Sequence, residues 1–198
     1  MEKGSLRGFA LAMAITPALS SAYDLTPDGA AIGYGHYLHN KAELNDYRAS
    51  LRWDWNRTWF EDSDTWQLTG FSDLAVNFWA SQLGPEDEPS PDGAADVHAI
   101  SFSPVFRLEH NTSDWMRLFV DAGVGLSYQS KKDIEKKLRS PINMGGHTQF
   151  EIRTLLGGRF GGQMQYELSA GWFHYSNAHI HPQNEGLDFG VVQFGYWW

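Results

Sequence analysis

An alternation of apolar and polar side chains between Trp115 and Tyr128 is the feature that most constrains how this chain can fold. The even positions of this segment carry Met, Leu, Val, Ala, Val, Leu and Tyr, whereas the odd positions include Arg117, Asp121 and Ser127. Successive side chains of a β-strand point to opposite faces. A period of two residues therefore predicts a strand with one apolar and one polar face.

Seven other segments have a similar pattern, and three of them, 51–59, 100–109 and 149–160, also place their charged side chains on one face. The eight predicted strands span residues 30–39, 47–60, 66–79, 97–109, 115–128, 147–160, 163–176 and 187–198. Most of them reach or exceed the roughly 9–11 residues that a tilted strand needs to cross a bilayer. The sequence therefore predicts an all-β fold, an eight-stranded antiparallel transmembrane outer-membrane β-barrel.

The polar face of the predicted strands distinguishes a membrane barrel from a soluble one. In a soluble lipocalin-like barrel the apolar face would line the inside, whereas in an outer-membrane barrel it faces lipid. The polar face here carries charges of both signs, including Arg107, Glu109, Glu151 and Arg153, which suits a narrow interior filled with paired side chains. Aromatic residues make up 15% of the chain and gather near strand ends, as in interfacial girdles. These features favour the outer-membrane barrel.

The first twenty-two residues have the features of a secretory signal peptide. Lys3 and Arg7 flank its start, residues 9–15 form an apolar run, and small residues at 20–22 offer a cleavage site. We therefore expect residues 1–22 to be a signal peptide and residues 23–198 to form the barrel. A transmembrane helix needs about 18 consecutive apolar residues, and no apolar stretch after residue 22 is nearly that long.

The charge balance and the lack of cysteine exclude several function classes. The chain has a net charge of −9, and removal of the signal leaves thirteen basic and twenty-three acidic residues. Nucleic acid is therefore not expected as a partner. The sequence contains no cysteine, so neither disulfide bonds nor thiolate catalysis is available.

The lengths of the predicted connections indicate which end of the barrel is extracellular. The connections after the third, fifth and seventh predicted strands are long, whereas those near 110–114 and 161–162 are short turns. Outer-membrane barrels have long extracellular loops and short periplasmic turns, so we expect the long connections outside. The last strand ends on Trp198, and a terminal aromatic strand is common in bacterial outer-membrane proteins. We therefore expect an integral, multi-pass protein of the cell outer membrane.

Three polar residues fall on the lipid-facing side of the last two predicted strands. The even positions of segment 163–176 face lipid, so His174 and Ser176 point outward, and the same parity in segment 187–198 points Asp188 outward. Polar groups that face lipid are costly unless they have partners. A serine, a histidine and an acid within reach of one another supply a nucleophile, a general base and a group that orients the base. Polar residues that merely face the lipid headgroups are the alternative interpretation.

The residues around this cluster also resemble a family motif. The motif consists of His174-Tyr175-Ser176-Asn177-Ala178 followed by Pro182, Asn184 and Gly186-Leu187-Asp188. It is similar to that of the PagL-type lipid A 3-O-deacylases, eight-stranded outer-membrane barrels that hydrolyse an ester of lipopolysaccharide. By this resemblance His174 is the base, Ser176 is the nucleophile, Asn177 helps to form the oxyanion hole, and Asn184 matches a further motif position.

The acid of the motif departs from the pattern of that family. The family's acid is commonly glutamate, whereas the matching position here holds Asp188, whose side chain is shorter. Glu185 is the alternative acid. The resemblance implies a serine esterase without cofactor or metal that hydrolyses the 3-O-linked acyl chain of lipid A and releases a 3-hydroxy fatty acid.

The same resemblance implies lipopolysaccharide and the outer membrane as partners, and we expect a monomer or a homodimer. Two alternative functions stay open. One is a non-catalytic barrel that serves as an adhesin or structural anchor, which would show no serine-dependent hydrolysis. The other is an outer-membrane phospholipase, which only a comparison of phospholipid with lipopolysaccharide as substrates would separate.

Two further groups of residues are candidates for binding. Five basic residues follow the fifth predicted strand, namely Lys131, Lys132, Lys136, Lys137 and Arg139. They are interpreted either as a solvated loop with a short helical turn or as contacts to the phosphates of lipopolysaccharide. His179 and His181 form a His-x-His pair, but no clear set of carboxylates accompanies it, so we do not expect a metal site.

Overall fold

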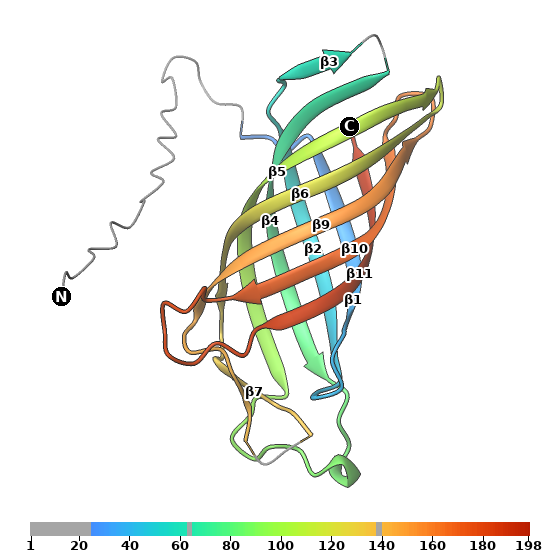
Figure 1. The fold of residues 1–198 in the computed structure, drawn as a ribbon. Helices are drawn as coiled ribbons and strands as arrows, with labels where there is room; N and C mark the ends of the chain where they lie inside the picture. Colours follow the sequence, from blue (N-terminus) through green and yellow to red (C-terminus); the bar gives the residue numbers. More distant parts are fainter. Residues whose placement is uncertain (1–24, 63–64, 138–139) are drawn as a thin grey trace, which may run out of the picture.

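A computed structural model of the chain describes residues 25–62, 65–137 and 140–198. Within these residues eight long antiparallel strands form a sheet that closes on itself, because β2 pairs with both β1 and β4 (Figure 1). The barrel strands are β1 (Gly29–Tyr37), β2 (Leu44–Asp54), β4 (Trp66–Ser81), β5 (Asp96–Ser113), β6 (Met116–Gln129), β9 (Thr148–Phe160), β10 (Tyr166–Ser176) and β11 (Leu187–Trp197). The predicted eight-stranded antiparallel barrel is confirmed. The predicted signal peptide, residues 1–22, and Arg139 lie outside the described residues.

Four short elements lie in the connections. These are β3 (Phe60–Asp62), which pairs with the start of β4, the 3-10 helix η1 (Pro85–Asp87), and the paired strands β7 (Asp133–Ile134) and β8 (Ile142–Asn143). In the part of the chain that the structure describes, no helix is long and apolar enough to cross a membrane.

The side chains of the barrel strands alternate between inside and outside as the sequence predicts. In β6, Phe119 and Asp121 are buried, whereas Leu118, Val120 and Val124 are exposed on the outer surface. Large apolar side chains are exposed in the same way on other strands, among them Ile32, Val76, Ile100, Phe102, Leu156, Leu168, Val192 and Phe194. The outer wall is therefore an apolar surface suited to contact with lipid acyl chains.

Most strands end within two residues of the predicted position, but two of them end four or more residues away from it. β2 ends at Asp54 rather than near residue 60, because the Asp54 carboxylate accepts the backbone N–H of Asn56 at 2.6 Å and Asn56 turns into a left-handed conformation with φ of +49°. β5 instead continues to Ser113, so the turn predicted at 110–114 shrinks to residues 114–115. The apolar alternation thus continues beyond the end of β2, whereas it stops before the end of β5.

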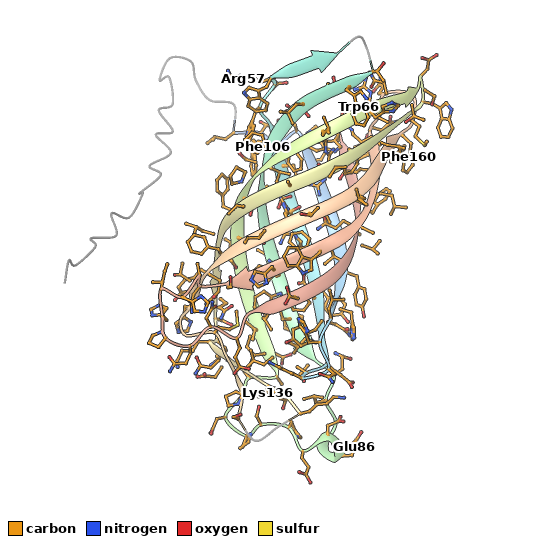
Figure 2. All side chains as sticks on the ribbon, in the orientation of Figure 1. Arg57, Trp66, Glu86, Phe106, Lys136 and Phe160 are labelled. Atoms are coloured by element: carbon orange, nitrogen blue, oxygen red, sulfur yellow. The ribbon has the colours of Figure 1, made fainter. Side chains whose placement is uncertain are left out.

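The long connections lie together at one end of the barrel. Residues 82–95, 130–137, 140–147 and 177–186 gather toward the lower end in Figure 1, whereas the C-terminus and the turns at 114–115 and 161–165 lie at the upper end. Lys136 and Glu86 are among the side chains at the lower end, and Trp66, Phe106 and Phe160 lie toward the other (Figure 2). The long connections thus share one end of the barrel, and their extracellular position stays a prediction.

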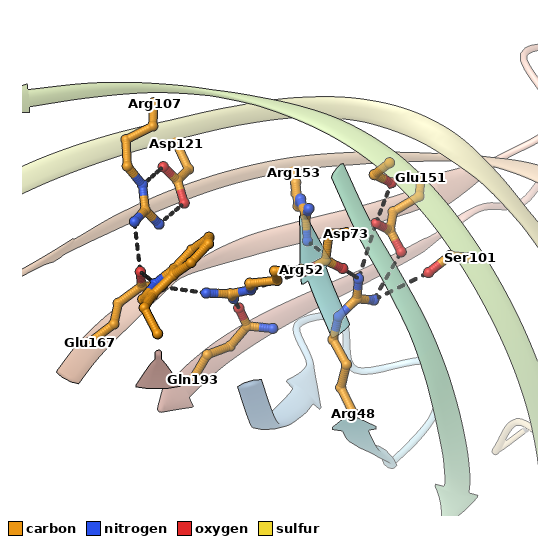
Figure 3. A network of polar contacts seen from close by, with 12 residues as sticks. Arg48, Arg52, Asp73, Ser101, Arg107, Asp121, Glu151, Arg153, Glu167 and Gln193 are labelled. Carbon is orange, nitrogen blue, oxygen red and sulfur yellow. Dashed lines mark hydrogen bonds and ion pairs between the residues drawn. The ribbon is translucent and has the colours of Figure 1, made fainter. Parts of the chain in front are cut away.

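The barrel interior is filled by paired charges. Arg48 donates to Asp73 at 2.8 Å and to Glu151 at 2.9 Å, and all three side chains are buried (Figure 3). Glu167 lies 2.7 Å from Arg52 and 2.6 Å from Arg107. Charges of both signs therefore neutralise one another along the barrel axis, as the sequence predicts for the polar face.

At the end where the long connections lie, the barrel interior is covered by apolar side chains from the β6–β9 connection (Figure 1). Ile134, Ile142 and Met144 are fully buried and belong to one cluster with inward-facing strand residues, including Trp79 and Leu44. In its described part, the segment after the fifth predicted strand therefore contains no helical turn, and only some of its side chains face solvent. It folds into the β7–β8 pair and packs across the barrel mouth.

Candidate active site

His174 and Asp188 face each other across the last two barrel strands. The register of β10 and β11 pairs them directly, and His174 Nδ1 lies 2.8 Å from Asp188 Oδ1. Their strand neighbours Phe173, Tyr175 and Phe189 are fully buried, so the pair projects from the outer face of the barrel. The structure thus brings the predicted base and the predicted acid into hydrogen-bond contact on the lipid-facing wall.

Ser176 is the last residue of β10 and shares the outer face with His174, two positions earlier. The chain returns beside both residues at Gly186, where an added Cβ would lie 3.3 Å from His174 Cε1 and 3.9 Å from Ser176 Cβ. Gly186 has a φ of +67°, a left-handed conformation that glycine adopts without strain. Glycine at this position therefore lets the backbone pass close to the histidine ring and the serine.

The contact with Asp188 determines which nitrogen of His174 is free to accept a proton. Because Nδ1 meets the carboxylate at 2.8 Å, Nδ1 is assigned the proton of the neutral ring and Nε2 keeps its lone pair. In a Ser–His–acid triad, Nε2 is the nitrogen that takes the proton of the serine hydroxyl. The tautomer of His174 therefore suits general-base catalysis.

Two partners of Asp188 were missed by sequence reasoning. Trp172 Nε1 donates to Asp188 Oδ1 at 2.9 Å, and its ring stacks on the His174 ring with centroids 5.5 Å apart. His39 Nε2 lies 2.8 Å from Asp188 Oδ2. Trp172 could have been found, because it shares the outward parity of His174. Only the closure of the barrel between β1 and β11 brings His39 to the site.

Asn177 and Asn184 hold the connection that follows Ser176. Asn184 Oδ1 accepts the backbone N–H of Asn177 at 2.9 Å. The side-chain amide of the buried Asn177 donates to the carbonyl oxygens of Met144 at 2.8 Å and Gln183 at 2.6 Å. Both amide hydrogens of Asn177 are therefore used within the protein. The side-chain amide of Asn184 accepts the bond from the Asn177 backbone through Oδ1. Its other amide atom, Nδ2, carries two N–H donors.

Glu185, the alternative acid, is bound to the β6–β9 connection. Its carboxylate lies 3.2 Å from Lys136 Nζ and accepts the backbone N–H of Asn143 at 3.3 Å. These contacts connect the loop after Ser176 to the segment that covers the barrel mouth. Asp188 is the acid that meets His174.

The predicted basic residues differ in their surroundings. Lys136 is buried against Glu185, and Lys137 forms an ion pair with Glu43 that raises the pKa of the Lys137 ammonium group. Lys132 is exposed and lies 3.2 Å from Asp133, and Lys131 is exposed as well. Lys131 and Lys132 are therefore the described members of this group that face solvent.

His179 and His181 lie exposed on the connection between β10 and β11. Among residues 25–62, 65–137 and 140–198, no group of three or more histidine, aspartate or glutamate side chains is arranged to hold a metal ion.

A closed eight-stranded barrel with an apolar outer wall is the architecture of an outer-membrane β-barrel protein. On that wall, at the end where the long connections lie, the His174–Asp188 pair is two positions from Ser176 along β10. The family model described as lipid A 3-O-deacylase (PagL) matches residues 45–197, and the chain belongs to this family.

Two relatives agree with this assignment. Lipid A deacylase PagL of Pseudomonas aeruginosa is 29% identical over 178 residues, which cover 90% of this chain and 92% of the relative. The crystal structure of the outer membrane enzyme PagL superimposes with a TM-score of 0.67 at 26% identity and covers 85% of this chain and 98% of that one. The predicted family and the outer-membrane location are confirmed.

Proposed function

We propose that this protein hydrolyses the ester of the acyl chain at the 3-position of lipid A, with Ser176 as nucleophile, His174 as general base and Asp188 as the acid that orients it. Membership of the lipid A 3-O-deacylase family supports the substrate and the reaction. The observation that most supports the residue assignment is the 2.8 Å contact between His174 Nδ1 and Asp188 Oδ1. His174 lies two residues before Ser176 on the same outer face.

The reaction proceeds in two acyl transfers. His174 Nε2 takes the proton of Ser176 as the serine oxygen attacks the ester carbonyl, and the imidazolium that forms is stabilised by Asp188. The bond between the carbonyl carbon and the sugar oxygen then breaks, and His174 returns the proton to that oxygen. Water, deprotonated by His174, then attacks the acyl-serine. The bond between the carbonyl carbon and the serine oxygen breaks, His174 returns the proton to that oxygen, and a 3-hydroxy fatty acid is released.

The oxyanion of each tetrahedral intermediate needs hydrogen-bond donors near Ser176. Asn184 is suited to this role because Asn177 holds its oxygen at 2.9 Å, which leaves its two amide hydrogens for the substrate. Asn177 contributes as a support, since its own amide donates to Met144 and Gln183. We propose Asn184 as the donor and Asn177 as the residue that positions it.

The position of the triad on the outer wall suits a substrate that is itself a membrane lipid. Lipid A lies in the outer leaflet, so it reaches the outer face of the barrel by lateral diffusion and needs no pore. The exposed Lys131 and Lys132 lie in the connection that covers the barrel mouth. The backbone carbonyl oxygen of Lys132 accepts the N–H of Met144, and the carbonyl oxygen of Met144 accepts the side-chain amide of Asn177. We propose that these two lysines contact the phosphates of lipopolysaccharide.

The proposal is tested by offering the purified barrel lipopolysaccharide and phospholipid side by side. Release of a 3-hydroxy fatty acid from lipopolysaccharide, with the amide-linked chain at the 2-position left in place, is the expected result. Preferential phospholipid hydrolysis would support the phospholipase alternative, and inactivity on both would support a non-catalytic barrel. Whether the protein is a monomer or a homodimer stays a prediction.

A further inference from the structure

Three hydrogen-bond donors converge on the carboxylate of Asp188. Oδ1 accepts from His174 Nδ1 at 2.8 Å and from Trp172 Nε1 at 2.9 Å, and both of these residues belong to β10. Oδ2 lies 2.8 Å from Nε2 of His39, which is in the connection between β1 and β2. His39 is therefore the partner of the carboxylate oxygen that does not face His174.

The backbone holds His39 in this position. The N–H of the preceding residue, Leu38, donates to the carbonyl oxygen of Asp188 at 2.9 Å, so the register of β1 and β11 continues to the residue before His39. The ring of Tyr37 packs edge-on against the His39 ring, with centroids 5.4 Å apart. An added Cβ at Gly190 would lie 2.9 Å from Leu38 Cδ2, so the glycine lets Leu38 lie against β11.

We propose that His39 is a positioning residue for the hydrolysis, and the proposal rests on the function of the triad argued above. The terminal torsion of an aspartate side chain has a broad, roughly two-fold profile, so a carboxylate held at one oxygen can rotate away from its partner. His39 holds Oδ2 and thereby keeps Oδ1 directed at His174 Nδ1. Nε2–H donates in the imidazolium and in the tautomer that this contact favours, so the contact does not depend on His39 being charged.

An exposed ion pair that merely stabilises the β1–β2 connection is the alternative, since the His39 side chain is 54% exposed. The two roles differ in what they affect. A positioning residue changes the turnover of bound substrate through Asp188, whereas a stabilising pair changes the amount of folded barrel. Kinetics of folded protein therefore separate them.

The experiment compares His39→Ala, His39→Gln and the control His36→Ala by steady-state hydrolysis of lipopolysaccharide in detergent micelles. Glutamine places an amide N–H at about the reach of Nε2, whereas alanine has no donor. His36 is a second exposed histidine of the same region, and it bonds to Asn45 instead of Asp188. Only fractions that show the mobility shift between unboiled and boiled samples, which marks the folded barrel, are compared.

We expect His39→Ala to lower kcat about tenfold with KM within about twofold of the parent, because misplacement of a catalytic group acts on the chemical step. His39→Gln should recover most of the loss, and His36→Ala should match the parent. In an Asp188→Ala background, His39→Ala should have no further effect, because the group it positions is gone.

Parental kcat in His39→Ala, equal loss in His39→Gln and His39→Ala, or an undiminished loss in the Asp188→Ala background would each overturn the proposal. Failure of the proposed function gives a different result, because the parent would then be inactive or Ser176→Ala would be active.

Discussion

Glu167 offers a test of whether paired charges hold the barrel together. Its carboxylate lies inside the barrel, 2.7 Å from Arg52, 2.6 Å from Arg107 and 3.0 Å from the indole nitrogen of Trp197. Glu167→Ala removes all three contacts and leaves two buried guanidinium groups with one acceptor fewer each. Removal of one member of a buried ion pair costs about 3–5 kcal/mol.

The remaining contacts place the expected loss at the lower end of that range. Arg107 keeps two bonds of 2.7 Å to Asp121, and Arg52 keeps Asp73 at 3.1 Å. We therefore expect Glu167→Ala to lower the free energy of unfolding by about 3 kcal/mol. Glu167→Gln, which keeps the size and one acceptor oxygen, should lose less.

Urea unfolding in detergent, followed by the gel mobility of unboiled samples, measures this loss. Ser169→Ala is the matched control, because Ser169 is the next inward-facing residue of β10 and its buried hydroxyl has no hydrogen-bond partner within the described residues. The control should stay within about 0.5 kcal/mol of the parent. Equal unfolding free energies for Glu167→Ala and Ser169→Ala would refute the view that the charge network stabilises the barrel.

Two further predictions concern the site. Asp188→Asn should lower kcat by roughly 10²–10⁴-fold, because it changes the tautomer of His174 and removes the negative charge beside it. Asp188→Glu should keep activity. Steady-state kinetics measure both, and parental kcat in Asp188→Asn would contradict the proposed role of the acid. The double variant Lys131→Ala with Lys132→Ala should raise the apparent KM for lipopolysaccharide and flatten its dependence on salt, because two exposed charges are lost. Unchanged salt dependence would remove these lysines from the substrate site.

The periodicity of the sequence was enough to predict the barrel and the face on which the proposed triad residues lie. Side-chain parity depends only on neighbouring residues, so His174, Ser176 and Asp188 could be assigned to the outer face before the register was known. The interior pairing followed from the same parity, because charges of both signs occupy the buried positions.

Contacts between distant segments could not be predicted in the same way. His39 and Asp188 are 149 residues apart, and only the pairing of β1 with β11 brings them together. Ile134 and Ile142 lie in a segment rich in charged residues that is too short in apolar alternation to predict a barrel strand, so their burial over the barrel mouth depends on the finished barrel. The end of β2 depended on a local turn at Asp54 that the apolar pattern masked.

The most direct test of the central claim is mass spectrometry of lipid A from cells that produce equal amounts of folded parent or Ser176→Ala protein. The parent should yield lipid A that has lost one ester-linked 3-hydroxyacyl chain, whereas Ser176→Ala should leave lipid A intact. His174→Ala should give the same result, and the double variant should be hardly worse than either single one, because the two residues act as a unit. Deacylated lipid A from cells with folded Ser176→Ala would contradict the assignment of Ser176 as the nucleophile.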